Sequence, residues 1–264
     1  MTAASDVTGR AVRRRGRPRL RGVWVARPLV VVAFLGLVEV CVRVGLINPL
    51  FVSAPSAALG EAVRGLAGGA LVLPLLVTLY ESAIAFAAAA VVGLIVGYLL
   101  WRSATLTRAY EPLVGALFAS PIILLYPIYL VLFGRTSVAI SAQAATLGVL
   151  PVILYTRQGL AGVPDPLIKT AIVHRLSRSR ALRYVLIPAA APTIFTGLRL
   201  AVTYVLISVV AMEYLAQIGG LGKVINQSYL RFDMVRVYAA MAVVIVVTAL
   251  LMAVTTWIER AVTR

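Results

Sequence analysis

The sequence is poor in the residues that carry most protein chemistry: it has one cysteine, one histidine and only 13% charged residues among 264. The single Cys41 excludes an intramolecular disulfide and a cysteine cluster. With His174 as the only imidazole, no nucleophile with its base and orienting group can be assembled. An ordinary soluble domain has about 25% charged residues, so a typical soluble enzyme is excluded too. We predict no catalytic residues and no metal site.

A phosphate-binding Walker loop is also missing. The pair Lys169-Thr170 imitates the end of that motif, but Ile168 stands where the motif needs glycine. The segment Gly219–Lys223 is rich in glycine and ends in lysine, but Val224 follows where serine or threonine is needed. The chain is therefore expected to hold no ATP and no other cofactor of its own, and the glycines are expected to form a tight turn.

Apolar sequence is abundant: 61% of the residues are hydrophobic and the mean hydropathy is +0.98. A helix of about 20 apolar residues crosses a hydrocarbon core of about 30 Å, and six runs reach that length. They cover residues 28–47, 73–100, 112–133, 137–156, 193–215 and 237–258. Each run is too apolar all round for a soluble amphipathic helix. The predicted fold class is an all-α polytopic membrane protein with six transmembrane helices.

The formal net charge of +16 is distributed unevenly along the chain. If the N-terminus lies inside, eighteen basic residues fall on the inner side of the six runs and five on the outer side. The positive-inside rule then places both termini in the cytoplasm. Residues 1–27 hold eight arginines and no apolar period, and we expect a disordered basic tail that touches anionic lipid. Residues 28–264 form the transmembrane domain, and no nucleic-acid partner is expected.

Ionisable residues inside the runs are candidates for function or for helix contacts, because an unpaired charge in a bilayer is costly. Glu39 and Arg43 are four residues apart and predict a local ion pair. Glu81 and Glu213 fall towards the outer ends of their runs, where they either act on a charged solute or are simply solvated. Arg199, near the inner end of the fifth run, is expected to snorkel or to contact another helix.

The third run carries Pro121 and Pro127, and each frees a backbone carbonyl and kinks a helix. Such kinks are tolerated where a span lines a cavity or neighbours rescue the backbone, so this run is the best candidate for a solute pathway. Ordinary packing with satisfied hydroxyls is the alternative for its tyrosines. The residues that we select as pathway candidates are Ser120, Pro121, Tyr126, Tyr129, Gln143, Tyr204, Ser208 and Glu213. By contrast, Gly93 and Gly97 predict a close helix contact.

The longest inner segment, about residues 157–192, is more than a connector. Asp165 as N-cap and Pro166 in the first turn open a short helix. The apolar residues that share one face of it are Leu167, Ile168, Ala171 and Ile172. A second basic helical stretch, Arg180–Ile187, is expected to end at Pro188. This helix-turn-helix element either faces the cytosol or lies on the bilayer surface.

Several motifs occur in a fixed order along the chain. They are APSA (54–57), SPIILLYPIYLVLFG (120–134), LPVIL (150–154), GVPDPLIKTA (162–171), VLIPAAAPTIFTGLRLA (185–201), AMEYL (211–215) and GGLG (219–222). Together they resemble the permease subunits of bacterial binding-protein-dependent ABC importers, most of all the nitrate, sulfonate and taurine group. Residues 162–201 resemble the EAA loop of that family, and the resemblance runs from Arg27 to the C-terminal end.

The resemblance implies a type I importer permease in the bacterial cytoplasmic (inner) membrane, with residues 157–192 as its coupling-helix loop. The implied partners are two cytosolic ABC ATPase subunits, which hold ATP and Mg, a second permease subunit and an extracytoplasmic solute-binding protein. ATP binding would move the coupling helices and drive alternating access for a small solute such as sulfonate, taurine, nitrate or another small organic anion. The implied ATPase-coupling residues are Asp165, Leu167, Ile168, Lys169, Ala171, Ile172, Arg175 and Pro188.

The EAA loop is degenerate at two places. The family has Glu-Ala-Ala where this chain has Lys169, Thr170 and Ala171, and glycine where it has Arg175. The changes reverse a charge and remove the residue most permissive of a tight turn. Docking then uses a different ATPase surface, or a second permease with a regular loop makes a heterodimer rather than a homodimer, or coupling is weakened.

Two other classes of protein stay open. An ion-coupled secondary transporter would show inverted repeats and acidic residues near the midplane. A membrane-bound enzyme would need a catalytic cluster, which the sequence does not offer.

Overall fold

The computed structural model describes residues 21–262, with side chains from residue 29 to residue 261, and this part of the chain contains helices and no strand. The all-helical prediction is confirmed. The α-helices are α1 (Arg21–Arg43), α2 (Pro55–Ala67), α3 (Val72–Arg102), α4 (Ala104–Ala119), α5 (Tyr126–Phe133), α6 (Ser137–Ala161), α7 (Asp165–Val173), α8 (Arg178–Ala181), α9 (Ile187–Ala216), α10 (Gly220–Leu230) and α11 (Met234–Val262). A 3-10 turn, η1 (Ile122–Leu125), precedes α5, and a π-helical turn, η2 (Leu182–Leu186), precedes α9.

The described residues contain four helices that are long and apolar enough to cross a membrane, or five if one bent pair counts as a single span. The four include α3, α6 and α11, and α9 counts together with α8 and η2 as Arg178–Ala216. The expected count of six is therefore supported only in part. The helix α1 begins at Arg21, so the expected boundary of the basic tail at residue 28 lies inside this helix; residues 1–20 of that tail lie outside the described residues.

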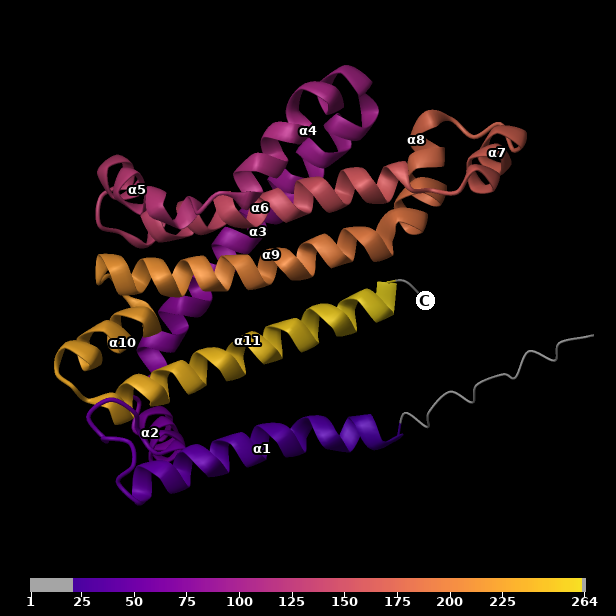
Figure 1. The fold of residues 1–264 in the computed structure, drawn as a ribbon. Coiled ribbons are helices and arrows are strands. Elements are labelled where there is room, and N and C mark those ends of the chain that lie inside the picture. Colours follow the sequence, from indigo (N-terminus) through magenta and orange to yellow (C-terminus); the bar gives the residue numbers. More distant parts are fainter. Residues whose placement is uncertain (1–20, 263–264) are drawn as a thin grey trace, which may run out of the picture.

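The third expected span, 112–133, is not one kinked helix. It consists of α4 and the η1–α5 segment, which meet at an angle of 86°. The break falls at Ser120-Pro121: the amide of Ser120 still bonds the carbonyl of Leu117 at 3.1 Å, whereas Pro121 has no amide to donate. The prolines predict an interruption but not its size, because α4 and α5 each pack against α6 (Figure 1).

The core of the fold is the contact of α3, α6 and α9: α6 and α9 run side by side, and α3 crosses both obliquely (Figure 1). Small residues bring these helices close together. A Cβ on Gly93 would lie 2.5 Å from Cβ of Val152, and one on Gly97 would lie 2.6 Å from Cβ of Thr156. Gly148 stands equally close to Val205 across the α6–α9 contact. The expected helix contact at Gly93 and Gly97 is confirmed.

The two ends of the molecule differ in what they carry. The helices α2 and α10 lie at one end of the long helices, while α7, α8, the start of α1 and the end of α11 lie at the other (Figure 1). The basic residues of these segments therefore lie at one end of the long helices, a distribution that agrees with the positive-inside rule.

The second basic stretch does not end at Pro188, which corrects the sequence prediction. The chain passes from α8 through η2 directly into α9, and Pro188 lies in the first turn of that helix. Pro188 has no amide to donate to the helical turn before it, and that turn is the π-helical η2. The π turn is wider than an α-helical turn and lets the chain stay helical past the proline. The fifth helix therefore begins earlier than residue 193.

Candidate functional site

The helix α7 presents an apolar face outward from the basic end. The exposed side chains are Leu167 (41% exposed), Ile168 (39%), Ile172 (69%) and Val173 (79%). Ala171, expected on the same face, is instead buried (6% exposed), because α7 packs against η2. Val173 was not selected from the sequence, since it sits one position beyond the chosen stripe. Four exposed aliphatic side chains on a helix of nine residues form a surface suited to a partner.

The two ends of α7 depart from the expected caps. The helix begins at Asp165, and Pro164 before it makes no side-chain capping bond. Asp165 therefore stands in the first turn instead of capping it, where a carboxylate still suits the positive end of the helix dipole.

At its other end α7 stops in a Schellman motif. The amide of Leu176 bonds the carbonyl of Ala171 at 3.0 Å and the amide of Arg175 bonds that of Ile172 at 2.9 Å. Arg175, the donor of the second bond, has a left-handed φ of 49°. The position that carries glycine in the EAA family is thus the left-handed position of this turn, and here an arginine adopts it.

The pathway candidates fall into three groups. Ser120 and Pro121 are exposed at the break between α4 and α5. Tyr126, Tyr129 and Tyr204 are half-buried: the first two pack on the core around Ile140 and Val209, and Tyr204 meets Phe118 edge-on with ring centroids 5.2 Å apart. The hydroxyl of Tyr129 shares a hydrogen bond of 2.7 Å with Thr146.

The third group has no exposed surface in this conformation: Gln143, Ser208 and Glu213 are each 0% exposed. Gln143 donates from Nε2 to the carbonyl of Ile123 at 2.9 Å and so ties α6 to the broken span. Its Oε1 and the hydroxyl of Ser208 find no hydrogen-bond partner among the described residues. A solute could reach these groups only after the helices move apart, so a pathway role for them stays a prediction.

Glu213 on α9 lies beneath the glycine turn that opens α10. Its Oε2 accepts the amide of Gly222 at 2.7 Å, and its Oε1 accepts the hydroxyl of Thr78 on α3 at 2.7 Å. The amide of Leu221 donates to the same Thr78 hydroxyl at 2.9 Å. The expected tight turn is confirmed, with φ of 56° at Gly219 and 49° at Gly220. Interfacial solvation of Glu213 is wrong, because the carboxylate is fully enclosed.

Glu81 on α3 is likewise 0% exposed, so interfacial solvation is wrong for it too. Its two carboxyl oxygens have no hydrogen bond of good geometry to any described residue. The groups that approach them are the hydroxyl of Ser137, at the start of α6, and the carboxyl of Glu213. Sequence reasoning did not bring the two glutamates together, because each was placed only by its depth in its own span.

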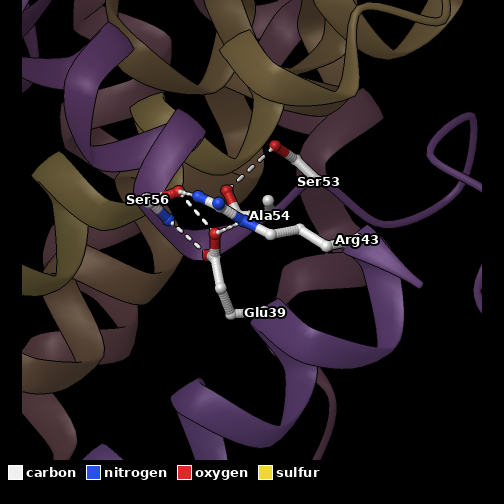
Figure 2. Close-up of polar contacts among 5 residues, drawn as sticks. All are labelled: Glu39, Arg43, Ser53, Ala54 and Ser56. Atoms are coloured by element: carbon white, nitrogen blue, oxygen red, sulfur yellow. Dashed lines mark hydrogen bonds and ion pairs between the residues drawn. The ribbon is translucent and has the colours of Figure 1, made fainter. Parts of the chain in front are cut away.

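The predicted pair of Glu39 and Arg43 is confirmed, with Nε 2.6 Å from Oε1. The structure adds a third member, Ser56, whose amide and hydroxyl donate to Glu39 at 2.9 and 2.6 Å (Figure 2). Ser56 lies in the first turn of α2, so the carboxylate satisfies a free amide at that helix end. This contact joins α1 to α2 at the end of the bundle opposite α7.

Two ion pairs link helices near the basic end. Arg199 lies 3.1 Å from Glu259 on α11, which confirms the expected contact with another helix. Arg157 on α6 lies 2.8 Å from Glu111 on α4, a pair that no local spacing in the sequence could indicate. No group of three or more His, Cys, Asp or Glu side chains in the described part of the chain could hold a metal ion.

These features define a multi-pass helical membrane protein that carries an exposed apolar helix on its basic face. The family model described as "Binding-protein-dependent transport system inner membrane component" matches residues 89–264. This match covers more than half of the chain, and the chain belongs to that family of inner-membrane permeases.

Individual relatives agree with this assignment. The chain is 31% identical over 157 residues to the nitrate import permease protein NrtB of Synechococcus elongatus, covering 60% of this chain and 56% of the relative. It is 32% identical over 145 residues to the bicarbonate transport system permease protein CmpB of the same organism (54% and 52% covered). It is 30% identical over 159 residues to the riboflavin transport system permease protein RibX of Chloroflexus aurantiacus (60% and 59%). These matches thus span little more than half the length of the relatives.

Solved structures show the same fold. A chain of the inward-facing MetNI methionine ABC transporter matches with a TM-score of 0.65 and 24% identity, over 74% of this chain and 96% of that one. A chain of an amino acid ABC transporter crystallised with histidines matches with a TM-score of 0.55 and 16% identity, over 72% and 91%. At these identities the likeness concerns the fold alone.

Proposed function

We propose that the chain is the membrane-spanning subunit of an ATP-driven importer and forms half of a solute pathway by alternating access. In this proposal α1, α3, the α4–α5 pair, α6, α9 and α11 are the six spans, and both termini are cytoplasmic. ATP hydrolysis belongs to two separate cytosolic subunits. Membership of the binding-protein-dependent family supports this proposal, as does the gathering of the basic segments at one end.

The observation that carries the proposal is the exposed apolar face of α7. In the chain, α7 follows α6 and precedes α9, and these two helices are the most deeply packed. Because α7 is joined to α9 through α8 and η2, a force on α7 is transmitted to the core of the bundle. The segment from α7 to α8 also carries exposed basic side chains: Lys169, Arg175, Arg178 and Arg180. We therefore expect the docking groove of the ATPase to be apolar at its centre and acidic at its rim.

For the solute we propose a small anion. Among the relatives, the names of NrtB and CmpB refer to nitrate and bicarbonate, and a permease of Bacillus subtilis, 24% identical, is named for aliphatic sulfonates. The riboflavin relative shows that the family extends to larger solutes. Uptake of labelled nitrate, bicarbonate and an alkanesulfonate into proteoliposomes holding the whole importer and its binding protein tests this proposal. Uptake of none of the three would contradict it.

The docking proposal is tested by replacing Leu167 and Ile168 with Asp. Two carboxylates in the apolar centre of an interface cannot be solvated there, so we expect the ATPase to be lost when the tagged chain is purified in mild detergent. The matched control is Leu59→Asp on α2, an exposed leucine (55%) at the opposite end, which should leave the ATPase bound. Retention of the ATPase by the double variant would exclude this face as the dock.

The same purification addresses the second permease. If mass spectrometry finds one permease species with two ATPases, the complex is a homodimer that accepts Lys169 and Arg175 at both docks. If it finds a second permease, the degenerate loop of this chain has a partner with a regular loop. Failure to recover any ATPase, even after cross-linking, would overturn the coupling role of α7 and favour the ion-driven alternative.

A further inference from the structure

Glu81 and Glu213 form a buried carboxyl pair between α3 and α9 at the outer end of the bundle. Both residues are 0% exposed. The turn that opens α10 covers the pair: a Cβ added to Gly219 would lie 3.6 Å from Oε1 of Glu81. Gly222 of the same turn donates its amide to Glu213 at 2.7 Å. Water therefore has no access to either carboxyl group in this conformation.

No basic side chain among residues 29–261 forms an ion pair with either carboxyl group. The ion pairs among the described residues join other side chains. At this end of the surrounding helices the basic residues include Arg135, just before α6, and Lys223 on α10; Arg157 on α6 and Arg199 on α9 form ion pairs with Glu111 and Glu259. Arg135 donates to the carbonyl of Ala216 at 2.5 Å, and neither Arg135 nor Lys223 forms an ion pair with Glu81 or Glu213. The other group facing the pair is the uncharged hydroxyl of Ser137.

The two carboxyl groups are unequally supplied with donors. Glu213 accepts one hydrogen bond at each oxygen, from Gly222 and Thr78, and such donors stabilise a carboxylate. Glu81 accepts none of good geometry from the described residues. Two facing carboxylates in an enclosed site cannot both be ionised. We propose that the pair binds one proton, held by Glu81, whose hydroxyl donates to the Glu213 carboxylate.

This proton holds α3 and α9 together at the outer end of the bundle. While it is bound, α3 and α9 are joined by a carboxyl–carboxylate hydrogen bond and the turn of α10 is seated on Glu213. If the outer end opens and the proton leaves, two like charges separate α3 from α9. Because the proton is bound in the closed form, its stabilisation is present at low pH and lost as the pH rises.

Infrared spectroscopy of the purified full-length chain in lipid tests the proposal directly. The wild-type protein at neutral pH should show the C=O stretch of a protonated carboxylic acid, and Glu81→Gln should remove it. Glutamine stays neutral and keeps a donor towards Glu213, so this variant should fold. The control is Glu61→Gln, whose carboxyl is partly exposed and ion-paired with Arg64 at 3.1 Å; it should leave the band unchanged. A wild-type spectrum without the band would overturn the proposal, even if no variant folds.

A second readout separates a proton site from a merely structural pair. The melting temperature of the wild-type chain should fall as the pH is raised, and that of Glu81→Gln should not. Glu213→Gln should be more damaging than Glu81→Gln. Both oxygens of Glu213 accept hydrogen bonds, from the Gly222 amide and the Thr78 hydroxyl, whereas a glutamine has only one acceptor oxygen and would turn its NH2 group towards one of these donors. An unchanged pH dependence in Glu81→Gln would overturn the proposal.

Discussion

The arginine in the Schellman turn of α7 offers a direct test of how the coupling loop is built. Arg175 adopts a φ of 49°, where Cβ crowds the following carbonyl at a cost of about 1–2 kcal/mol for a residue other than glycine. Glycine at this position removes that cost but loses more backbone freedom on folding. We expect Arg175→Gly to stabilise the turn by about 1 kcal/mol net, which is about a fivefold change in the local opening equilibrium.

The matched control is Arg175→Ala. Alanine removes the same charge and the same long side chain as glycine, but it keeps the Cβ that causes the strain. The difference between the two variants therefore isolates the left-handed conformation from any electrostatic effect of the guanidinium. The amides that report on it are those of His174, Arg175 and Leu176, which bond the carbonyls of the last turn at 2.9–3.0 Å.

Hydrogen–deuterium exchange of the full-length chain in lipid, followed by mass spectrometry, measures this local opening. Peptides that cover the end of α7 should exchange about five times more slowly in the glycine variant than in the alanine variant. Peptides from α2, far from the turn, should exchange equally in both. Equal exchange at α7 would refute the argument that this position is strained.

Two further predictions concern close approaches of glycine. Gly220→Ala would place a Cβ against the buried carboxyl of Glu213 at a left-handed φ. It should lower the melting temperature of the purified chain, whereas Gly60→Ala, with open space around it, should not. Gly93→Ala would bring its Cβ to 2.5 Å from that of Val152 and should destabilise the α3–α6 contact by about 1–3 kcal/mol. Adding Val152→Gly, which removes the facing Cβ itself, should restore part of that loss, and additive effects of the two substitutions on thermal unfolding would contradict the contact.

The sequence predicts the helices of the core well, because their signal is local. Apolar runs that are long enough to cross a membrane predict α3, α6, α9 and α11 directly. The sequence places the start of α9 too late, because Pro188 is a strong local signal for the end of a helix. Its effect depends on the turn before it, and the π turn η2 accommodates it.

The broken third span shows the opposite case. Pro121 and Pro127 predict an interruption, but the 86° between α4 and α5 is set by contacts of both pieces with α6. Those contacts join residues far apart in the chain, such as Gln143 and Ile123. A local pattern specifies where a helix can break, whereas packing decides where the second piece goes.

The glycine turn at Gly219–Gly222 shows how a local motif and a distant contact complete each other. Three glycines predict a turn, yet conformational freedom explains only Gly219 and Gly220, which have positive φ. Gly222 is required for space: a Cβ there would meet the α9 backbone at Tyr214 N at 2.8 Å. Only this approach lets its amide reach Glu213 at 2.7 Å. The positive end of α10 then stabilises a carboxylate that burial alone would disfavour, and the carboxylate in turn satisfies a free amide of α10. Glu213 therefore holds the outer end of the fold together in this conformation, and a contact with solute requires α10 to lift first.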